Sequence, residues 1–141
     1  MTDTATETRS VVIERTFRHP LDKLWRALTE SWLLAEWMMP NDFSPEVGTS
    51  FTFRAEPVAQ WNGIVEGEVL EVVPQRRLRY RWGTGPLSWI VTIDLTAVDE
   101  GVHLRFEGSG IPPEPKGAAA GARYGWEQKF LPALDELLDR M

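Results

Sequence analysis

Two histidines and no cysteine are considered first, because these side chains often bind metals or act in catalysis. His19 precedes a proline, and His103 has an outward position on a predicted strand. Neither has a second histidine or a carboxylate at the spacing of a metal-binding motif. The absence of cysteine excludes disulfides, thiolate nucleophiles and thiolate metal sites. The sequence therefore predicts no metal site and no cofactor.

Serines and carboxylates form no catalytic motif either. Ser50, Ser88 and Ser109 lack a plausible base, and the chain contains neither a Gly-x-Ser-x-Gly sequence nor a glycine-rich phosphate loop. Acid–base chemistry would need a carboxylate of raised pKa inside a cavity. Arg15 and Glu71 are the polar residues with inward parity, and either one orients a ligand's polar group or it is solvated at the sheet rim. We predict no catalytic residue.

The aromatic content is the most informative feature of the sequence. Aromatic residues make up 11% of the chain and include seven tryptophans, whose rings bury large areas and whose N–H groups need partners. Small residues such as Gly67 and Gly108 lie among these rings, so the rings pack less readily into a solid core. Inward positions predict a ligand-binding cavity lined by Trp37, Phe43, Phe53, Trp61, Val65, Tyr80, Trp82, Trp89, Phe106, Tyr124, Trp126 and Phe130. The alternative is that the rings fill this space themselves.

Alternating apolar and polar residues predict six strands that would hold these rings. The strands are expected at residues 11–18, 49–56, 61–73, 77–82, 87–98 and 102–109. In the fourth, Leu78, Tyr80 and Trp82 face inward and alternate with arginines that face water. Short connections join the last four strands, so these strands must form an antiparallel meander.

Helical spacing predicts two short helices, at 20–29 and 32–38, and a long helix at 120–140. Trp126, Phe130 and Leu134 form the apolar stripe of the long helix, and Pro132 is expected to bend it. This helix is the one long cover for the apolar face of the sheet. The predicted fold class is α+β: a curved six-stranded antiparallel sheet wraps the long C-terminal helix, with two short helices between the first and second strands.

The order of these elements, with their residues, resembles the START-like superfamily of helix-grip folds, also called SRPBCC, and within it the branch of the activator of the heat-shock-protein-ninety ATPase. The similarity covers about residues 10–140. It rests on Ile13–Phe17, His19–Thr29, Leu34–Trp37, Gly67–Pro74, Arg77–Trp82 and Gly125–Trp126. The resemblance implies a cavity for lipids, polyketides or other apolar molecules, and some members are enzymes. A tryptophan pair is common in relatives where this chain has Trp37 followed by Met38 and Met39.

Charge and hydropathy restrict the partners. The net charge of −6 disfavours nucleic-acid binding. No apolar run approaches the roughly 20 residues that cross a bilayer. We expect residues 1–9 to be a disordered tail without a signal peptide, and residues 10–141 to be a single START-like domain. The lack of cysteine fits a cytoplasmic protein.

Three functions follow from these observations. The first is binding of a small hydrophobic or aromatic molecule, such as a lipid or a polyketide-like compound, in an internal cavity. The second is an enzyme of the polyketide cyclase or aromatase kind, in which Arg15, Glu71 or Tyr80 would touch the ligand. The third is stimulation of a heat-shock ATPase through an exposed apolar patch on Leu33–Met39 or on the long helix. The Met38-Met39 pair could also serve a homodimer.

Overall fold

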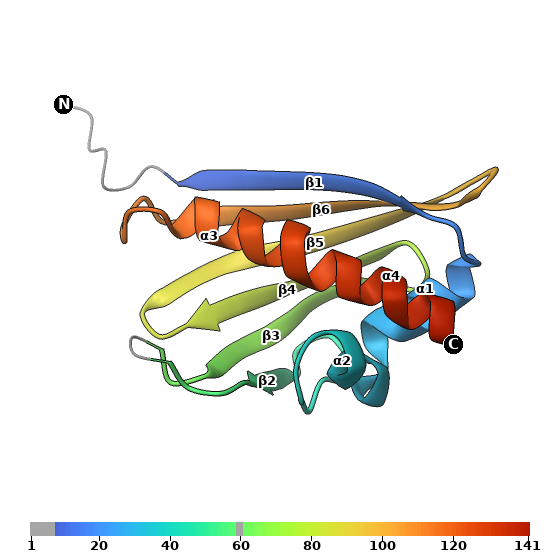
Figure 1. The fold of residues 1–141 in the computed structure, drawn as a ribbon. Coiled ribbons are helices and arrows are strands. Elements are labelled where there is room, and N and C mark those ends of the chain that lie inside the picture. The colour runs from blue at the N-terminus through green and yellow to red at the C-terminus, as the bar shows by residue number, and fades with distance from the viewer. Residues whose placement is uncertain (1–7, 59–60) are drawn as a thin grey trace.

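The computed structural model describes residues 8–58 and 61–141. Its ribbon shows a curled sheet packed against a long helix (Figure 1). The elements, in chain order, are β1 (Arg9–Phe17), α1 (Leu21–Thr29), α2 (Ser31–Trp37), β2 (Ser50–Arg54), β3 (Ile64–Val73), β4 (Arg77–Thr84), β5 (Leu87–Val98), β6 (Gly101–Ile111), α3 (Ala118–Tyr124), η2 (Gly125–Phe130) and α4 (Leu131–Arg140). The predicted fold class is confirmed.

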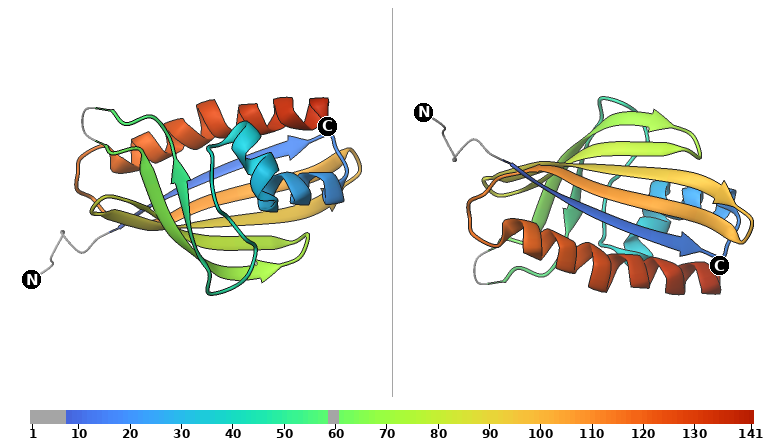
Figure 2. Two further views of the ribbon diagram at one scale, coloured as in Figure 1. Left: turned by 90° about the horizontal axis from the view of Figure 1, so that it is seen from below. Right: turned by 90° about the horizontal axis from the view of Figure 1, so that it is seen from above.

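All six strands belong to one antiparallel sheet with the order β1-β6-β5-β4-β3-β2. Hairpins connect β3 to β4, β4 to β5 and β5 to β6, which confirms the predicted meander. The chain passes from β1 through α1 and α2 to β2 at the opposite edge of the sheet. Figure 2 shows the sheet curling around the long helix, with α1 and α2 closing one end.

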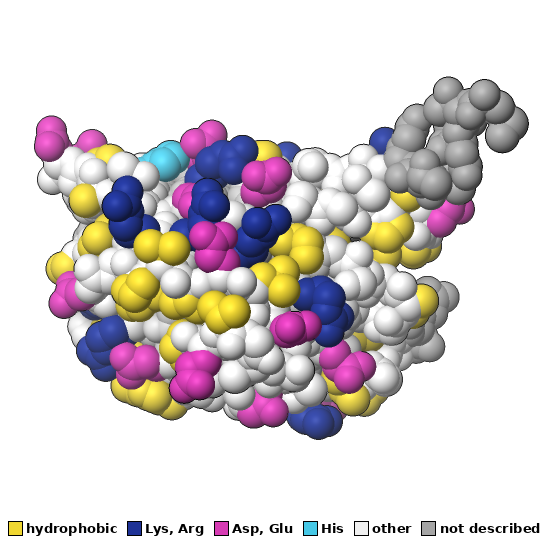
Figure 3. Space-filling model, turned by 180° about the vertical axis from the view of Figure 1, so that it is seen from behind, with side chains coloured by type: hydrophobic (Ala, Val, Ile, Leu, Met, Phe, Trp, Pro, Cys, Tyr) yellow, Lys and Arg dark blue, Asp and Glu magenta, His cyan; other side chains and the backbone are white. Residues whose placement is uncertain are grey.

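Period-two alternation explains which face of the sheet is covered. In β5, Trp89, Val91, Ile93 and Leu95 are buried, while the residues between them reach the outer face. Figure 3 views the molecule from behind, where basic and acidic side chains are intermixed on both sides of a band of hydrophobic side chains. The outer face is therefore a solvated surface and the inner face carries the core.

A β-bulge in β3 changes the parity that the sequence predicts. Val69 and Glu71 pair with successive residues of β4, so Leu70 is an extra residue between them. After the bulge, Val72 packs against the core, and the Glu71 carboxylate lies 3.7 Å from the Arg77 guanidinium on the outer face. The inward position predicted for Glu71 is therefore wrong.

The long helix contains a π-helical segment, η2, between two α-helical segments. Pro132 lies in the first turn of α4, directly after this segment. Its nitrogen has no hydrogen to donate to the preceding turn, and the wider π turn adjoins the position of the missing bond. The irregularity predicted from Pro132 thus takes the form of a π segment through which the helical path continues (Figure 1).

Large rings fill the middle of the fold between sheet and helix. Trp126 stacks on Phe106 with centroids 4.5 Å apart and meets Trp37 edge-on at 6.3 Å. Phe43 and Tyr80 lie 5.9 Å apart in the same apolar cluster. The interpretation that rings occupy the space themselves therefore holds for this central part.

Two expectations concern the chain outside this core. The predicted tail, residues 1–9, falls mainly on residues 1–7, which lie outside the described residues, and Arg9 already belongs to β1. None of the helices in the described segments has the length and hydropathy that a membrane crossing requires.

Candidate functional site

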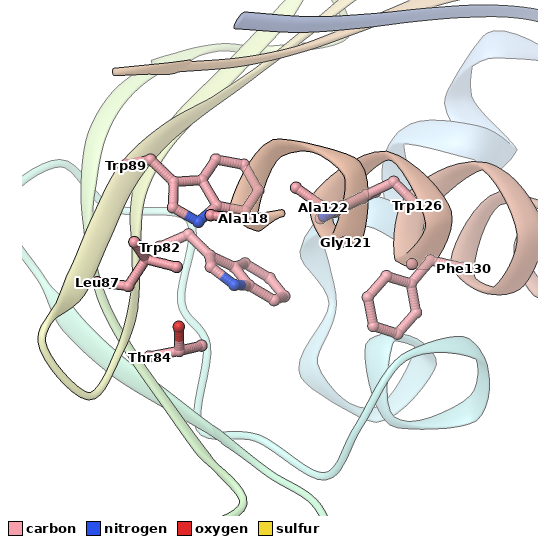
Figure 4. Close-up of a pocket in the computed structure, with 10 residues that line it drawn as sticks. Trp82, Thr84, Leu87, Trp89, Ala118, Gly121, Ala122, Trp126 and Phe130 are labelled. Atoms are coloured by element: carbon pink, nitrogen blue, oxygen red, sulfur yellow. The ribbon is translucent and has the colours of Figure 1, made fainter. Parts of the chain in front are cut away.

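The rings leave an open groove at one end of the fold, between the long helix and the β4–β5 hairpin. Its inner part, the helix lobe, has a volume of about 280 Å³. Trp82 of β4 and Trp89 of β5 form the sheet wall and the long helix forms the opposite wall (Figure 4). The helix contributes Ala118, Gly121, Ala122, Gly125, Trp126 and Phe130.

The groove continues into a second part, the loop lobe, of about 640 Å³. Both lobes share Trp82, Thr84, Leu87 and Phe130, so they adjoin one another. The loop lobe is otherwise lined by Met38, Met39, Ala55, Trp61, Val65, Pro86, Pro115 and Lys129. A space of this size accommodates a small organic molecule.

The glycines of the long helix keep the helix lobe open. A Cβ placed on Gly121 or Gly125 would meet no atom within 4 Å outside the helix's own backbone. Across the groove, the Trp82 and Trp89 rings lie with centroids 5.9 Å apart. The sheet wall therefore carries two indoles. The helix wall has a smooth part made of alanines and glycines, which is followed by the Trp126 and Phe130 rings.

Few polar groups reach the groove. Thr84 contributes a half-buried hydroxyl, and the exposed Lys129 contributes an ammonium group. The Lys129 Nζ lies 5.6 Å from the centroid of the Tyr124 ring, and it forms no ion pair with an acidic side chain of the described residues. The site is therefore apolar, with neutral donors inside and one cation at its edge.

Half of the predicted cavity residues line this groove. These are Trp61, Val65, Trp82, Trp89, Trp126 and Phe130. The others that are buried lie in the core away from both lobes, namely Trp37, Phe43, Phe53, Tyr80 and Phe106. Tyr124 is 57% exposed, so its predicted inward position is wrong.

The polar candidates do not line the groove. Arg15 faces the long helix, as its parity predicts, but it forms a 3.1 Å ion pair with Asp135. Glu71 lies on the outer face beside Arg77. Tyr80 is 2% exposed, and burial raises the pKa of its hydroxyl above the ordinary value, so the group stays protonated. None of the three is placed to contact a ligand in the groove.

A histidine cluster joins the end of the long helix to the β1–α1 corner. The Nε2 atom of His19 lies 3.0 Å from an Asp139 oxygen, and Asp135 is close enough to complete a possible metal-ligand set. However, the Lys23 ammonium lies 3.3 Å from Nδ1 of His19, and Arg15 already pairs with Asp135. Both ring nitrogens are therefore engaged, and the cluster is an ion-pair anchor of the helix. The sequence did not reveal it because His19 and Asp139 are 120 residues apart.

The surface patch expected on Leu33–Met39 is also absent from the described structure. Leu33, Leu34, Trp37 and Met39 are buried. Met38 is half-buried and lines the loop lobe together with Met39. The methionine pair therefore belongs to the groove, and of the two only Met38 is partly exposed.

Several groove residues were not predicted. A readable signal existed for the helix wall, because Ala118, Gly121, Ala122 and Gly125 recur at spacings of three and four, which places small residues on one helical face. No such pattern marked Thr84, Leu87 or Lys129, whose positions depend on how the hairpin meets the helix.

Comparisons with known proteins agree with this fold. Residues 18–139 match the family model described as Activator of Hsp90 ATPase homolog 1-like protein. Protein MLL2253 from Mesorhizobium loti is 45% identical, with a TM-score of 0.85 over 94% of this chain and 98% of that one. Protein CV1439 from Chromobacterium violaceum is 25% identical, with a TM-score of 0.75 over 92% and 96% of the two chains. DynU16, a protein of the dynemicin biosynthetic locus, is 26% identical, with a TM-score of 0.78 over 92% of this chain and 47% of that one. No curated protein matches.

Proposed function

This chain belongs to the family of Activator of Hsp90 ATPase homolog 1-like proteins, and we propose that it binds a small apolar or aromatic molecule in the groove between its long helix and its β4–β5 hairpin. The fold is that of the START-like superfamily.

One observation carries the proposal. The groove remains open beside a core of packed rings, and glycines on the helix keep it open. Filling it would need only a larger residue at Gly121 or Gly125, where a side chain has room. An apolar molecule entering it would remove indole and methionine surface from water, which favours binding.

The comparison with DynU16 supports a small organic ligand. That protein is described by its place in a biosynthetic locus, which is a setting of small-molecule chemistry. The match covers 92% of this chain. We transfer from it the class of ligand and no reaction.

The two alternative functions receive less support. A cyclase-like enzyme would need Arg15, Glu71 or Tyr80 at the ligand, and these residues lie elsewhere. Among the described residues that line the groove there is no carboxylate and no histidine for acid–base chemistry. A heat-shock ATPase partner would need an exposed apolar patch on Leu33–Met39 or on the long helix. Most of Leu33–Met39 is buried, and on the long helix the exposed large ring is that of Tyr124.

Tryptophan fluorescence tests the proposal, because Trp82, Trp89 and Trp126 line the site. The protein is titrated with 1-anilinonaphthalene-8-sulfonate and with a long-chain fatty acid. Saturable changes in tryptophan emission are expected with the wild-type protein. Gly125→Leu should abolish them, because the leucine side chain would occupy the helix lobe, whereas Gly125→Ala adds one methyl group and should retain binding.

Thermal unfolding of both variants provides the control. Each should melt at or above the wild-type temperature, because the added side chain meets open space and glycine is a poor helix former. Equal binding by wild-type protein and Gly125→Leu would place the ligand outside the groove and refute the proposal. No saturable response to either compound would also refute it.

A further inference from the structure

Indole N–H donors at the groove have no acceptor among the described residues. Trp82 and Trp89 are 6% and 5% exposed, and they are direct cross-strand neighbours. Among described residues, the indole N–H groups of Trp37 and Trp61 donate to backbone carbonyls, whereas those of Trp82, Trp89 and Trp126, which all line the helix lobe, have no acceptor within hydrogen-bonding distance. Trp82 and Trp89 lie together on the sheet wall, where one ligand atom can reach both. An indole nitrogen can donate but cannot accept. The indole N–H groups of Trp82 and Trp89 are therefore free to donate to an acceptor from outside the chain, which is either water or a ligand.

The unpaired N–H groups face open space. No fully enclosed side-chain nitrogen or oxygen of the described residues lacks a partner, so each of these two nitrogens retains some accessible surface. Both indoles line the helix lobe, and Figure 4 draws their nitrogen edges toward the residues of the groove. An acceptor that reaches them must therefore come through the groove.

The rest of the lining supplies donors as well. Thr84 has a hydroxyl that both donates and accepts, and Lys129 has an ammonium that only donates. The described residues of the two lobes include no carboxylate, histidine or side-chain amide. If the polar groups of a ligand were mainly donors, neither these donors nor the indole N–H groups would find an acceptor. Unpaired donors in a buried site cost binding free energy.

The shape of the helix lobe restricts the apolar part of the ligand. The two indoles oppose a helix face made of Ala118, Gly121 and Ala122. A flat ring system fits a space between aromatic faces and a smooth backbone, and it gains from stacking on the indoles.

We propose that the groove selects aromatic molecules carrying a hydrogen-bond-acceptor oxygen, and that the indole N–H groups of Trp82 and Trp89 bind this oxygen. The inference rests on the proposed binding function and assigns its specificity. The oxygen belongs either to a neutral carbonyl or to a carboxylate, and for a carboxylate Lys129 supplies a compensating charge at the loop lobe.

Three compounds with one ring system test the selection: naphthalene, 1-acetonaphthone and 1-naphthoate. Each is titrated into protein labelled with nitrogen-15, and the seven indole N–H signals are followed by NMR. Trp82→Phe and Trp89→Phe assign two of the signals. The acetonaphthone should bind tighter than naphthalene by roughly three- to tenfold, the range expected for one net hydrogen bond. It should also move the Trp82 or Trp89 indole proton downfield, which naphthalene should not do.

Substitutions separate the role of the N–H from that of the ring. Trp82→Phe and Trp89→Phe keep an aromatic face and remove the donor, so the preference for acetonaphthone should decrease while naphthalene still binds. Trp32→Phe is the matched control, because Trp32 is 63% exposed and does not line either lobe. Lys129→Met distinguishes the two kinds of acceptor. If the groove selects a carboxylate, the variant should bind 1-naphthoate more weakly and 1-acetonaphthone as tightly as the wild-type protein does. If the groove selects a neutral carbonyl, the affinities for both compounds should stay unchanged.

The outcomes distinguish this inference from the binding function. Equal affinities for naphthalene and acetonaphthone, with no downfield shift of either indole proton, would overturn the acceptor selection and leave binding in the groove intact. A lack of saturable shifts with all three compounds would overturn both. Unchanged selectivity in both phenylalanine variants would assign the acceptor contact to another group and overturn the role of the indoles.

Discussion

Phe106 of β6 and Trp126 of η2 are stacked, with ring centroids 4.5 Å apart and planes inclined by 27°. Trp126 is 1% exposed, and its ring also contacts Trp37 and Trp82. Since Trp126 also lines the helix lobe, one indole forms both the end of the packed interior and the start of the groove.

Truncation of this indole should cause a large loss of stability. Trp126→Ala is expected to lower the free energy of unfolding by about 3–5 kcal/mol, because it removes a buried ring from the contact between sheet and helix. Chemical denaturation followed by circular dichroism measures the loss. Trp32→Ala, at an exposed tryptophan, should change stability by no more than about 0.5 kcal/mol. Similar losses in the two variants would contradict the anchoring role of Trp126.

Gly108 determines the position of the Trp89 ring. A Cβ at Gly108 would lie 2.7 Å from Cζ3 of Trp89, so Gly108→Ala must displace the indole toward the helix lobe. We expect weaker binding of the acetonaphthone and a stability loss of about 1–3 kcal/mol from overpacking. Ser109→Ala, at the next residue of β6, is the control. An unchanged chemical shift of the Trp89 indole would show that the ring has not moved and would refute this prediction.

Tyr80 should make stability fall at alkaline pH. Burial raises its pKa above the ordinary value of about 10. Above that pH an unfolded tyrosine loses its proton while folded Tyr80 keeps it, so the free energy of unfolding decreases as pH rises. Denaturation curves between about pH 9 and pH 11 should show a smaller decrease for Tyr80→Phe than for the wild-type protein. Parallel pH profiles would mean that Tyr80 ionises equally in both states.

Arg15 and Glu71 should not affect ligand binding. Arg15→Met breaks the partly exposed pair with Asp135, which should cost at most about 1 kcal/mol. Glu71→Gln affects an exposed contact on the outer face. Affinities for the acetonaphthone, measured by the indole shifts, should equal the wild-type value in both variants. A fall in affinity for either one would restore that residue as a polar group of the site.

Much of the fold could be predicted from the sequence because local patterns determine it. Strict alternation in Leu78, Tyr80 and Trp82 fixed the inner face of β4, and all three are buried as predicted. The position of Glu71 could not be predicted. The bulge at Leu70 reverses which residues of β3 face inward, and no residue type in this segment indicates a bulge. One-dimensional periodicity assumes a regular strand, and it fails where the strand gains a residue.

The candidate site was harder to predict than the fold. Inward parity identifies the rings that face the helix. It does not distinguish rings that pack into the core from rings that line an open groove. Tyr80 satisfies the same pattern as Trp82 on the same strand, yet it packs against Phe43 in the core, while Trp82 lines the groove. The difference arises from Gly121 and Gly125, which lie opposite Trp82 in the structure. They are more than 30 residues away from Trp82 along the chain, and the position of their helix depends on its contacts with the whole sheet.

The π segment has a consequence for how the groove could have arisen. It lies between the leucines of α4, which pack on the core, and the small residues of α3, which line the groove. A π turn holds about one more residue than an α turn, so the six residues of η2 sweep roughly the angle of five α-helical residues. One residue gained here by an ancestral α-helix is therefore absorbed within the wider turn. The leucines of α4 and the small residues of α3 keep their orientation relative to each other across such an insertion.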